Sequence, residues 1–201
     1  MQRFLLCLFG VIFAFPSFSQ RKLILNAVNK KLDSARHYQR ILIVGEGGMQ
    51  SRMFLDFLSE ELIKDLKDQD IVCKYEYLGD PHKTNTEESL KKAVSWEHDA
   101  ILRFYPLATF ESVNVVQTQT PYGPPVYNSR GASTTPPARA GYSLSSQQYL
   151  VNDFDIVLNE NKETIWSAKL YSAIEFGRNT VYKRIRKMIL SDMEKQNVLQ
   201  K

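Results

Sequence analysis

The residues with the clearest chemical potential form a short glycine-rich turn between an apolar run and a helical pattern. They are Gly45, Glu46, Gly47 and Gly48. At such a turn, free backbone N–H groups and the dipole of the following helix favour a phosphate or a carboxylate. The spacing departs from the dinucleotide-binding pattern GxGxxG, because Gln50 stands where the third glycine is required. A simple turn that lets the helix fold back closely on the strand is the alternative interpretation, since glycine tolerates left-handed backbone.

Three further polar residues are expected near this turn. Arg52 lies at the start of the predicted helix, and Asp80 and His82 follow the next predicted strand. The carboxyl ends of parallel strands meet at one edge, where open sheets bind ligands, so these residues and Glu46 predict a cleft for a polar ligand. Within this cleft, His82 could serve as a general base. A capped surface loop without a ligand is the alternative.

The histidines and cysteines predict no metal centre, no cofactor site and no catalytic residue. His37 and His98 precede predicted strands whereas His82 follows one, so they fall at opposite edges of the sheet. Cys73 is expected to point into the core as a small apolar residue. No GxSxG, HExxH or CxxC pattern occurs. The sequence therefore favours a protein that is not an enzyme.

In the N-terminal half, predicted strands alternate with predicted helices. Ile41–Val44 has no polar face, which is typical of a strand covered on both sides. Ile71–Leu78 alternates and predicts a second strand nearer an edge, and Ala100–Tyr105 opens a third. A long helix with Phe54, Leu55, Leu58, Leu62 and Leu66 at helical spacing separates the first two strands. A short helix, with the spacing of a capping box at Thr84–Glu87, precedes the third. This order predicts a parallel sheet with right-handed crossovers.

The C-terminal half predicts an antiparallel meander closed by a helix. Phe154–Leu158 and Thr164–Tyr171 should pair as a hairpin across a turn at Asn159–Lys162. Val181–Met193 carries apolar residues at helical spacing, and Asn179 or Thr180 can cap that helix. Together the two halves predict an α/β fold with a mixed sheet, parallel strand-helix-strand units first and the antiparallel meander with its packing helix last.

Residues 21–39 are ambiguous. Ile24, Val28 and Leu32 fall at roughly helical spacing, but polar residues such as Asn26 weaken the pattern. A short helix is therefore expected about as strongly as an irregular segment.

Residues 117–149 form the segment least like the rest of the chain. They hold five prolines and no acidic residue, which indicates a loop. As an exposed arm the loop would bind a partner, because proline pre-orders extended chain and tyrosine supplies contact area. The candidate contact residues are Tyr122, Tyr127, Arg130, Arg139 and Tyr142. A disordered insert is an equal alternative, since structureless connections of this length are uncommon unless functional or disordered.

The first residues predict export. Arg3 precedes an apolar run from Phe4 to Phe15, and Ser17–Ser19 suits cleavage after Ser19, so residues 1–19 read as a signal peptide. We expect Gln20 at the mature N-terminus, a single domain over residues 20–201, and a periplasmic or secreted protein. Cys7 lies inside the apolar run rather than after it, so no lipid anchor is expected. The run is also too short for a comfortable transmembrane anchor.

The net charge of the chain bears on the class of partner that it binds. The formal net charge of +4 falls to +3 when Arg3 is removed, which is too small to indicate nucleic acid as a partner. The last predicted helix nevertheless carries several cations: Arg178, Lys183, Arg184, Arg186 and Lys187. This basic face allows weak contact with a membrane surface or an acidic protein, and a packed, solvated helix is the favoured alternative.

The layout resembles small envelope domains of the TolB N-terminal and LpoB-like type, including Gram-negative families of unknown function. The resemblance rests on Ile41–Gly48 and Thr164–Ala168 and spans Ile41 to Leu199. It implies a binding or assembly module and transfers no catalytic residue, and this chain lacks the anchor cysteine of the lipoprotein members. The expected function is an exported envelope accessory that binds an envelope protein or another macromolecule. The alternative is a small-molecule or anion-binding domain that uses the carboxyl-edge cleft.

Overall fold

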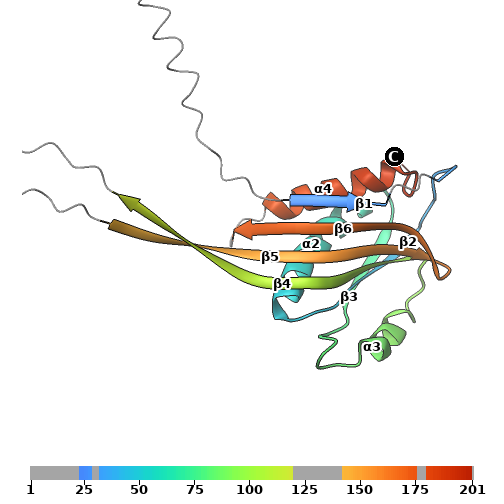
Figure 1. Ribbon diagram of the computed structural model, residues 1–201. Coiled ribbons are helices and arrows are strands. Elements are labelled where there is room, and N and C mark those ends of the chain that lie inside the picture. Colours follow the sequence, from blue (N-terminus) through green and yellow to red (C-terminus); the bar gives the residue numbers. More distant parts are fainter. Residues whose placement is uncertain (1–22, 29–31, 120–141, 176–179, 201) are drawn as a thin grey trace, which may run out of the picture.

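The computed structural model describes residues 23–28, 32–119, 142–175 and 180–200. Six strands form one mixed sheet in the order β1-β6-β5-β4-β2-β3 (Figure 1). The strands are β1 (Leu23–Ala27), β2 (Arg40–Gly45), β3 (Val72–Tyr77), β4 (Ala100–Gln119), β5 (Tyr142–Glu160) and β6 (Glu163–Glu175). The helices are α2 (Met49–Lys67), α3 (Thr86–Ala93) and α4 (Thr180–Lys195). β2 pairs in parallel with β3 and β4, and the other pairs are antiparallel, so the predicted mixed α/β fold is confirmed.

Strand β2 is covered on both faces, as its unbroken apolar run predicts. Ile41 and Ile43 belong to the main core, and Leu42 and Val44 belong to a smaller cluster on the other side. All four side chains are at most 2% exposed. The strand therefore fixes the position of the glycine turn that follows it.

The main core lies between the sheet and two helices, α2 and α4. Phe54 of α2 stacks on Phe154 of β5 at 5.2 Å and contacts Tyr182 of α4 at 5.5 Å between ring centroids. Arg186 of α4 also forms ion pairs with Glu61 and Asp65 of α2, at 3.5 and 3.2 Å. The predicted packing of the last helix on the sheet is confirmed, and its Arg186 is engaged within the fold.

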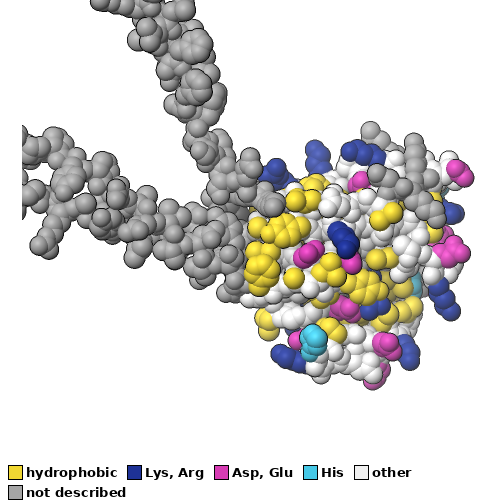
Figure 2. Space-filling view, viewed as in Figure 1, with side chains coloured by type: hydrophobic (Ala, Val, Ile, Leu, Met, Phe, Trp, Pro, Cys, Tyr) yellow, Lys and Arg dark blue, Asp and Glu magenta, His cyan; other side chains and the backbone are white. Residues whose placement is uncertain are grey.

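The opposite face of the sheet is covered only in part. α3 packs over β2, where Ala93 joins the smaller cluster with Leu42, Val44 and Leu78. Among the described elements, no helix covers this face over β1, β6, β5 and β4, which Figure 1 shows in front of α2 and α4. Hydrophobic side chains are mixed with charged ones over that open face in Figure 2.

The start of α3 differs slightly from the predicted capping box. The N-cap is Asn85, whose side chain accepts a hydrogen bond from the backbone N–H of Glu88 at 3.2 Å. Thr84 instead donates its hydroxyl hydrogen to the carbonyl of Asp80 at 2.9 Å. Asparagine caps a helix as well as threonine does, so the cap moves by one residue without loss.

Residues 23–27 form a strand, so the expected short helix in residues 21–39 is wrong there. β1 pairs antiparallel with β6, and Leu23, Leu25 and Ala27 pack against the main core. Ile24 lies on the other face and is 36% exposed. In a segment this short, the apolar positions are consistent with both the helical and the strand periodicity. Pairing with the free edge of β6 favours the strand.

Strand β4 is much longer than predicted, because it continues past Pro106. The register with β5 shifts between Pro106 and Ala108, which makes Leu107 a bulge, and pairing then runs on to Gln119 and Tyr142. A proline in a strand is tolerated at such a bulge. The predicted loop at 117–149 therefore has wrong boundaries, because 117–119 and 142–149 are strand. Of its candidate contact residues, Tyr142 begins β5, while Tyr122, Tyr127, Arg130 and Arg139 lie outside the described residues.

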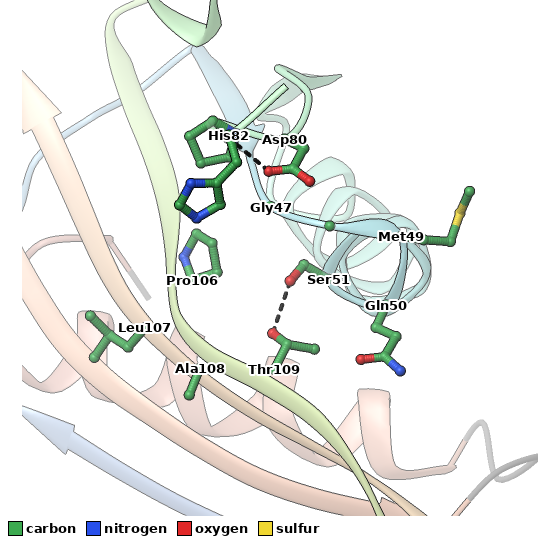
Figure 3. Close-up of a pocket in the computed structure, with 12 residues that line it drawn as sticks. Gly47, Met49, Gln50, Ser51, Asp80, His82, Pro106, Leu107, Ala108 and Thr109 are labelled. Carbon is green, nitrogen blue, oxygen red and sulfur yellow. Dashed lines mark hydrogen bonds between the residues drawn. The ribbon is translucent and has the colours of Figure 1, made fainter. Parts of the chain in front are cut away.

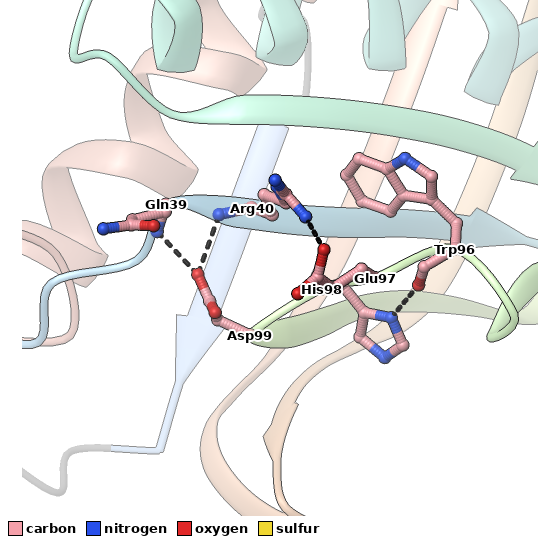
Figure 4. A network of polar contacts seen from close by, with 6 residues as sticks. All are labelled: Gln39, Arg40, Trp96, Glu97, His98 and Asp99. Carbon is pink, nitrogen blue, oxygen red and sulfur yellow. Dashed lines mark hydrogen bonds and ion pairs between the residues drawn. The ribbon is translucent and has the colours of Figure 1, made fainter.

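The predicted hairpin turn between β5 and β6 is confirmed. Asn161 and Lys162 join β5 to β6 with φ of 50° and 71°, the backbone of a tight hairpin turn. At the same edge of the sheet, Asp99 accepts hydrogen bonds from the backbone N–H groups of Gln39 and Arg40 at 2.6 and 2.8 Å (Figure 4). This contact ties the start of β2 to the start of β4.

Candidate functional site

The carboxyl edge of β2 and β3 holds a cavity of about 510 Å³ (Figure 3). It is lined by Gly47–Ser51, Asp80–His82 and Pro106–Thr109. These segments are the turn after β2 with the start of α2, the loop after β3, and the bulge of β4. The structure therefore brings together the glycine turn, Asp80 and His82, which the sequence placed at one edge.

The glycine turn is held by a tyrosine from the neighbouring strand. Tyr77 of β3 donates its hydroxyl hydrogen to the carbonyls of Gly47 and Gly48, at 3.1 Å for the second. The N–H of Gly47 donates to the carbonyl of Gly79 at 3.0 Å. Burial, and then the nearby carboxylate of Asp80, raises the pKa of Tyr77 above its usual value, so this hydroxyl stays a donor. These bonds keep the turn in one conformation.

Gly47 is required in that conformation. Its φ of 133° is a region that residues with a side chain rarely adopt, and an added Cβ would lie 2.6 Å from the Cβ of Ser51. Gly48 is different, since an added Cβ would meet no atom within 4 Å. The two glycines therefore have separate roles: Gly47 permits the turn, and Gly48 leaves open space at the start of α2.

The start of α2 is electrostatically favourable for an anion. Gly48 is its N-cap and provides no side-chain hydrogen bond, and the first turn contains no acidic residue. Asp80 opposes this preference with a carboxylate at the same cavity. One of its oxygens accepts the backbone N–H of His82 at 3.0 Å, and the other lies 3.8 Å from the ammonium of Lys83. The acid is thus partly offset, and the cavity is polar rather than strongly charged.

The far wall of the cavity was not predicted from the sequence. The hydroxyls of Ser51 in α2 and Thr109 in β4 lie 2.9 Å apart and join the helix to the strand. Thr109 was not placed because the predicted third strand was assigned only over Ala100–Tyr105. The signal available was Pro106 itself, since a proline inside an apolar strand pattern indicates a bulge.

Three of the predicted site residues do not line the cavity. Gly45 is the last residue of β2, and an added Cβ there would lie 2.5 Å from the side chain of Leu55. Glu46 is 7% exposed and pairs with Arg103 of β4 at 3.0 Å. Arg103 in turn lies over the ring of Tyr105, 4.3 Å from its centroid. Arg52 pairs with Asp56 at 3.8 Å on the outside of α2. The charges of Glu46 and Arg52 therefore serve the surrounding structure and do not face the cavity.

Polar side chains that line the cavity contact one another or the backbone. Ser51 and Thr109 bond to one another, and Asp80 bonds to the backbone of His82 rather than to its ring. Within the described residues, neither hydroxyl bonds a histidine or a carboxylate, which is the contact that activates a nucleophile. His98 lies at the opposite edge of the sheet, where its ring contacts the carbonyl of Trp96 (Figure 4).

Comparison with known proteins gives distant structural likenesses. No protein-family model and no curated protein matches the sequence. The PelC dodecamer of Paraburkholderia phytofirmans is similar with a TM-score of 0.45 and 10% identity, over 90% of this chain and all of that one. A substituted variant of that dodecamer gives 0.46 and 10%, over 88% of this chain and 99% of its own. A likeness this weak transfers no function to the present protein.

A second candidate surface is the extension of β4 and β5 beyond the sheet. β2 pairs with β4 only as far as Phe104, and β6 pairs with β5 only from Tyr149 onward. Ser112–Gln119 and Tyr142–Tyr149 therefore form a two-stranded ribbon that projects from the body in Figure 1. Within the described residues, each strand of this ribbon has almost its whole outer edge unpaired.

None of the described helices is long and apolar enough to cross a membrane.

Proposed function

We propose that this protein is an exported, non-enzymatic module that binds a macromolecular partner of the cell envelope through the β4–β5 ribbon. The observation that carries the proposal is the pair of outer edges on the ribbon, from Ser112 to Gln119 and from Tyr142 to Gln148. Export is the expectation from residues 1–19, and the lack of an activated nucleophile at the cavity favours binding over catalysis.

A two-stranded ribbon that projects from the sheet is expected to be only marginally stable unless a partner binds it. A two-stranded hairpin is at best marginally stable in water, and its unpaired N–H and C=O groups are a template for another strand. A partner that adds a strand would satisfy those groups and stabilise the ribbon. The connection at 120–141, rich in proline and tyrosine, would then supply side-chain contacts at its end.

Two deletions separate the ribbon from its connection. Gln119 is opposite Tyr142, and Asn114 is opposite Gln147. Joining Gln119 to Tyr142 by an Asn-Gly turn removes the connection alone, whereas joining Asn114 to Gln147 in the same way also removes most of the ribbon. Both variants should keep the melting transition of the body, because they retain the parts of β4 and β5 that pair with β2 and β6.

The readout is photo-crosslinking in envelope extracts. A photo-reactive residue at Val113 should capture a specific partner, and the same residue at Val94, which is 38% exposed beside α3, is the control. Capture should fall at least about tenfold when the ribbon is removed. Equal capture at both positions, or capture that survives the ribbon deletion, would refute the proposed surface.

Export is tested separately. Mass spectrometry of the protein from the envelope fraction should find Gln20, in open or cyclised form, at the N-terminus. Intact Met1 on protein from the cytosol would contradict export while leaving the ribbon hypothesis in place.

A second candidate function, binding of a small anion, is favoured by the cavity at the start of α2. Phosphate, nucleotides and carboxylates can be screened by thermal shift, since a ligand at 100 times its dissociation constant adds about 2.7 kcal/mol of stability. Gly48→Asp places a carboxylate at the N-cap, where there is room for it, and should abolish the shift while keeping the fold. Gly48→Ser, which adds no charge, is the matched control. No shift of wild type with any ligand would reject this function.

A further inference from the structure

A groove runs between the outer edge of β1 and helix α4, away from both surfaces described above. Its volume is about 420 Å³. It is lined by Leu25 of β1 and by Arg184, Lys187, Met188, Ser191, Asp192 and Lys195 of α4. The α4 residues recur every three or four positions, so they form one stripe along the helix.

The groove is basic, and its cationic side chains are accessible to a ligand. Arg184, Lys187 and Lys195 are exposed, and within the described residues none of them has an ion-pair partner. The single acid, Asp192, is engaged by the indole N–H of Trp166 at 2.8 Å and by the side chain of Gln196 at 2.6 Å. Figure 2 shows Lys and Arg side chains along the upper rim, over α4. An occupant of the groove should therefore be acidic.

The other wall of the groove is a free strand edge. Among the described strands, β1 is the last of the sheet on its side and pairs with β6 alone. The N–H of Val28 donates to the carbonyl of Ser167 at 2.9 Å, so the backbone of the even-numbered residues of β1 points toward β6. The backbone groups of Leu23, Leu25 and Ala27 consequently point outward, beside α4.

We propose that this groove binds an acidic, extended segment of a partner protein, which adds to β1 as a seventh strand. Residues opposite Leu25 in an antiparallel added strand would have their side chains on the same face as Leu25, which is the face of α4. Acidic side chains there would meet Arg184 and Lys187. Backbone pairing would provide affinity, and the cations would select the sequence.

The occupant cannot be one of the long segments of this chain that the structure leaves undescribed. Residues 1–22 and 120–141 contain no aspartate and no glutamate. Charge complementarity therefore favours a separate polypeptide. This surface is independent of the β4–β5 ribbon, so the two proposals can fail separately.

The probe is a labelled, end-blocked heptapeptide of alternating valine and glutamate, measured by fluorescence anisotropy against the folded protein. Binding should weaken at least about tenfold in the variant Arg184→Gln/Lys187→Gln and when the salt concentration is raised to about 0.5 M. The control Lys91→Gln/Lys183→Gln removes two exposed cations outside the groove and should bind like wild type. A peptide with lysine in place of glutamate should not bind. If both double variants lose peptide binding equally, the binding depends on net charge alone, and the proposal is overturned.

Backbone methylation of the peptide tests strand addition directly. N-methylation of every glutamate blocks an antiparallel added strand, and N-methylation of every valine blocks a parallel one, while the charges stay the same. One of the two should abolish binding and the other should be tolerated. Tolerance of both would refute strand addition. Binding of anionic lipid vesicles that depends on Arg184 and Lys187, without peptide binding, would show a membrane contact instead and also overturn the proposal.

Discussion

Asn152 of β5 and Ser172 of β6 are directly opposite one another inside the core, and both are fully buried. Neither side chain has a hydrogen-bond partner among the residues that the structure describes. The pair separates Leu150 from Phe154 and Leu170 from Ile174, all of which are core residues. Two polar side chains thus occupy positions where the strand pattern calls for apolar ones.

Replacing this pair by apolar residues should stabilise the protein. Asn152→Val with Ser172→Ala removes buried groups that lose their water on folding without a compensating bond, and should raise the free energy of unfolding by about 1 to 3 kcal/mol. Chemical denaturation of wild type, both single variants and the double variant measures the effect. A loss of stability would mean that the pair is hydrogen-bonded in solution, for example through a buried water.

The two glycines at the start of α2 should respond oppositely to serine. Gly47→Ser should cost about 1 to 3 kcal/mol, because its φ is positive and the new Cβ would clash with Ser51. Gly48→Ser should be neutral or gain a few tenths, about 0.3 kcal/mol, because serine at an extended N-cap bonds the first turn of the helix. Thermal melts of the two variants compare the same chemical change at adjacent positions. Similar effects at both would contradict the conformation of the turn.

Ile43→Asp should unfold the protein. The side chain of Ile43 is 0% exposed, and an unpaired carboxylate there costs several kcal/mol against a total of about 5 to 15. Val72→Asp is the control, because Val72 lies in edge strand β3 and is 58% exposed. Circular dichroism should show loss of the cooperative melt in the first variant alone. A near-normal melt of Ile43→Asp would mean that β2 is exposed.

The stability should depend on pH through Cys73. Burial raises the pKa of its thiol from 9.0 to about 11. The thiolate is therefore disfavoured in the folded state, so this contribution is complete below about pH 9 and is lost as the pH rises toward about 11. The difference in unfolding free energy between wild type and Cys73→Ala, in chains starting at Gln20, should shrink from about pH 8 to about pH 10. The comparison cancels the contribution of Tyr38 and Tyr75, whose pKa values are also raised by burial and which are present in both chains. A constant difference would place the thiol in water.

The sequence predicts those parts of the fold where a strong local pattern of residues is compatible with only one structure. Ile41–Val44 is apolar at every position, which only a doubly covered strand accommodates, and the glycine turn after it follows directly. The same reasoning places Asp80 and His82 beside that turn, because parallel strands end at one edge.

Features that depend on register could not be predicted. The pairing of Glu46 with Arg103 requires knowing that Val44 lies opposite Arg103. Thr109 reaches the cavity because a bulge at Leu107 shifts the strand by one residue. The ribbon could not be predicted, because the composition of residues 117–149 indicates a loop. In the structure, cross-strand pairing continues β4 to Gln119 and starts β5 at Tyr142.

The pairing of β1 with β6 also sets the order in which the sheet can be completed. Leu25 lies opposite Leu170, so the two strands come from opposite ends of the chain. In a chain that is synthesised or delivered N-terminus first, β1 arrives before every other strand, and its neighbour arrives after all of them. Such non-local pairing slows folding and leaves strand edges exposed to misassembly in the meantime. The groove beside α4 therefore comes into existence only at the last stage of folding, when β6 and α4 are both in place.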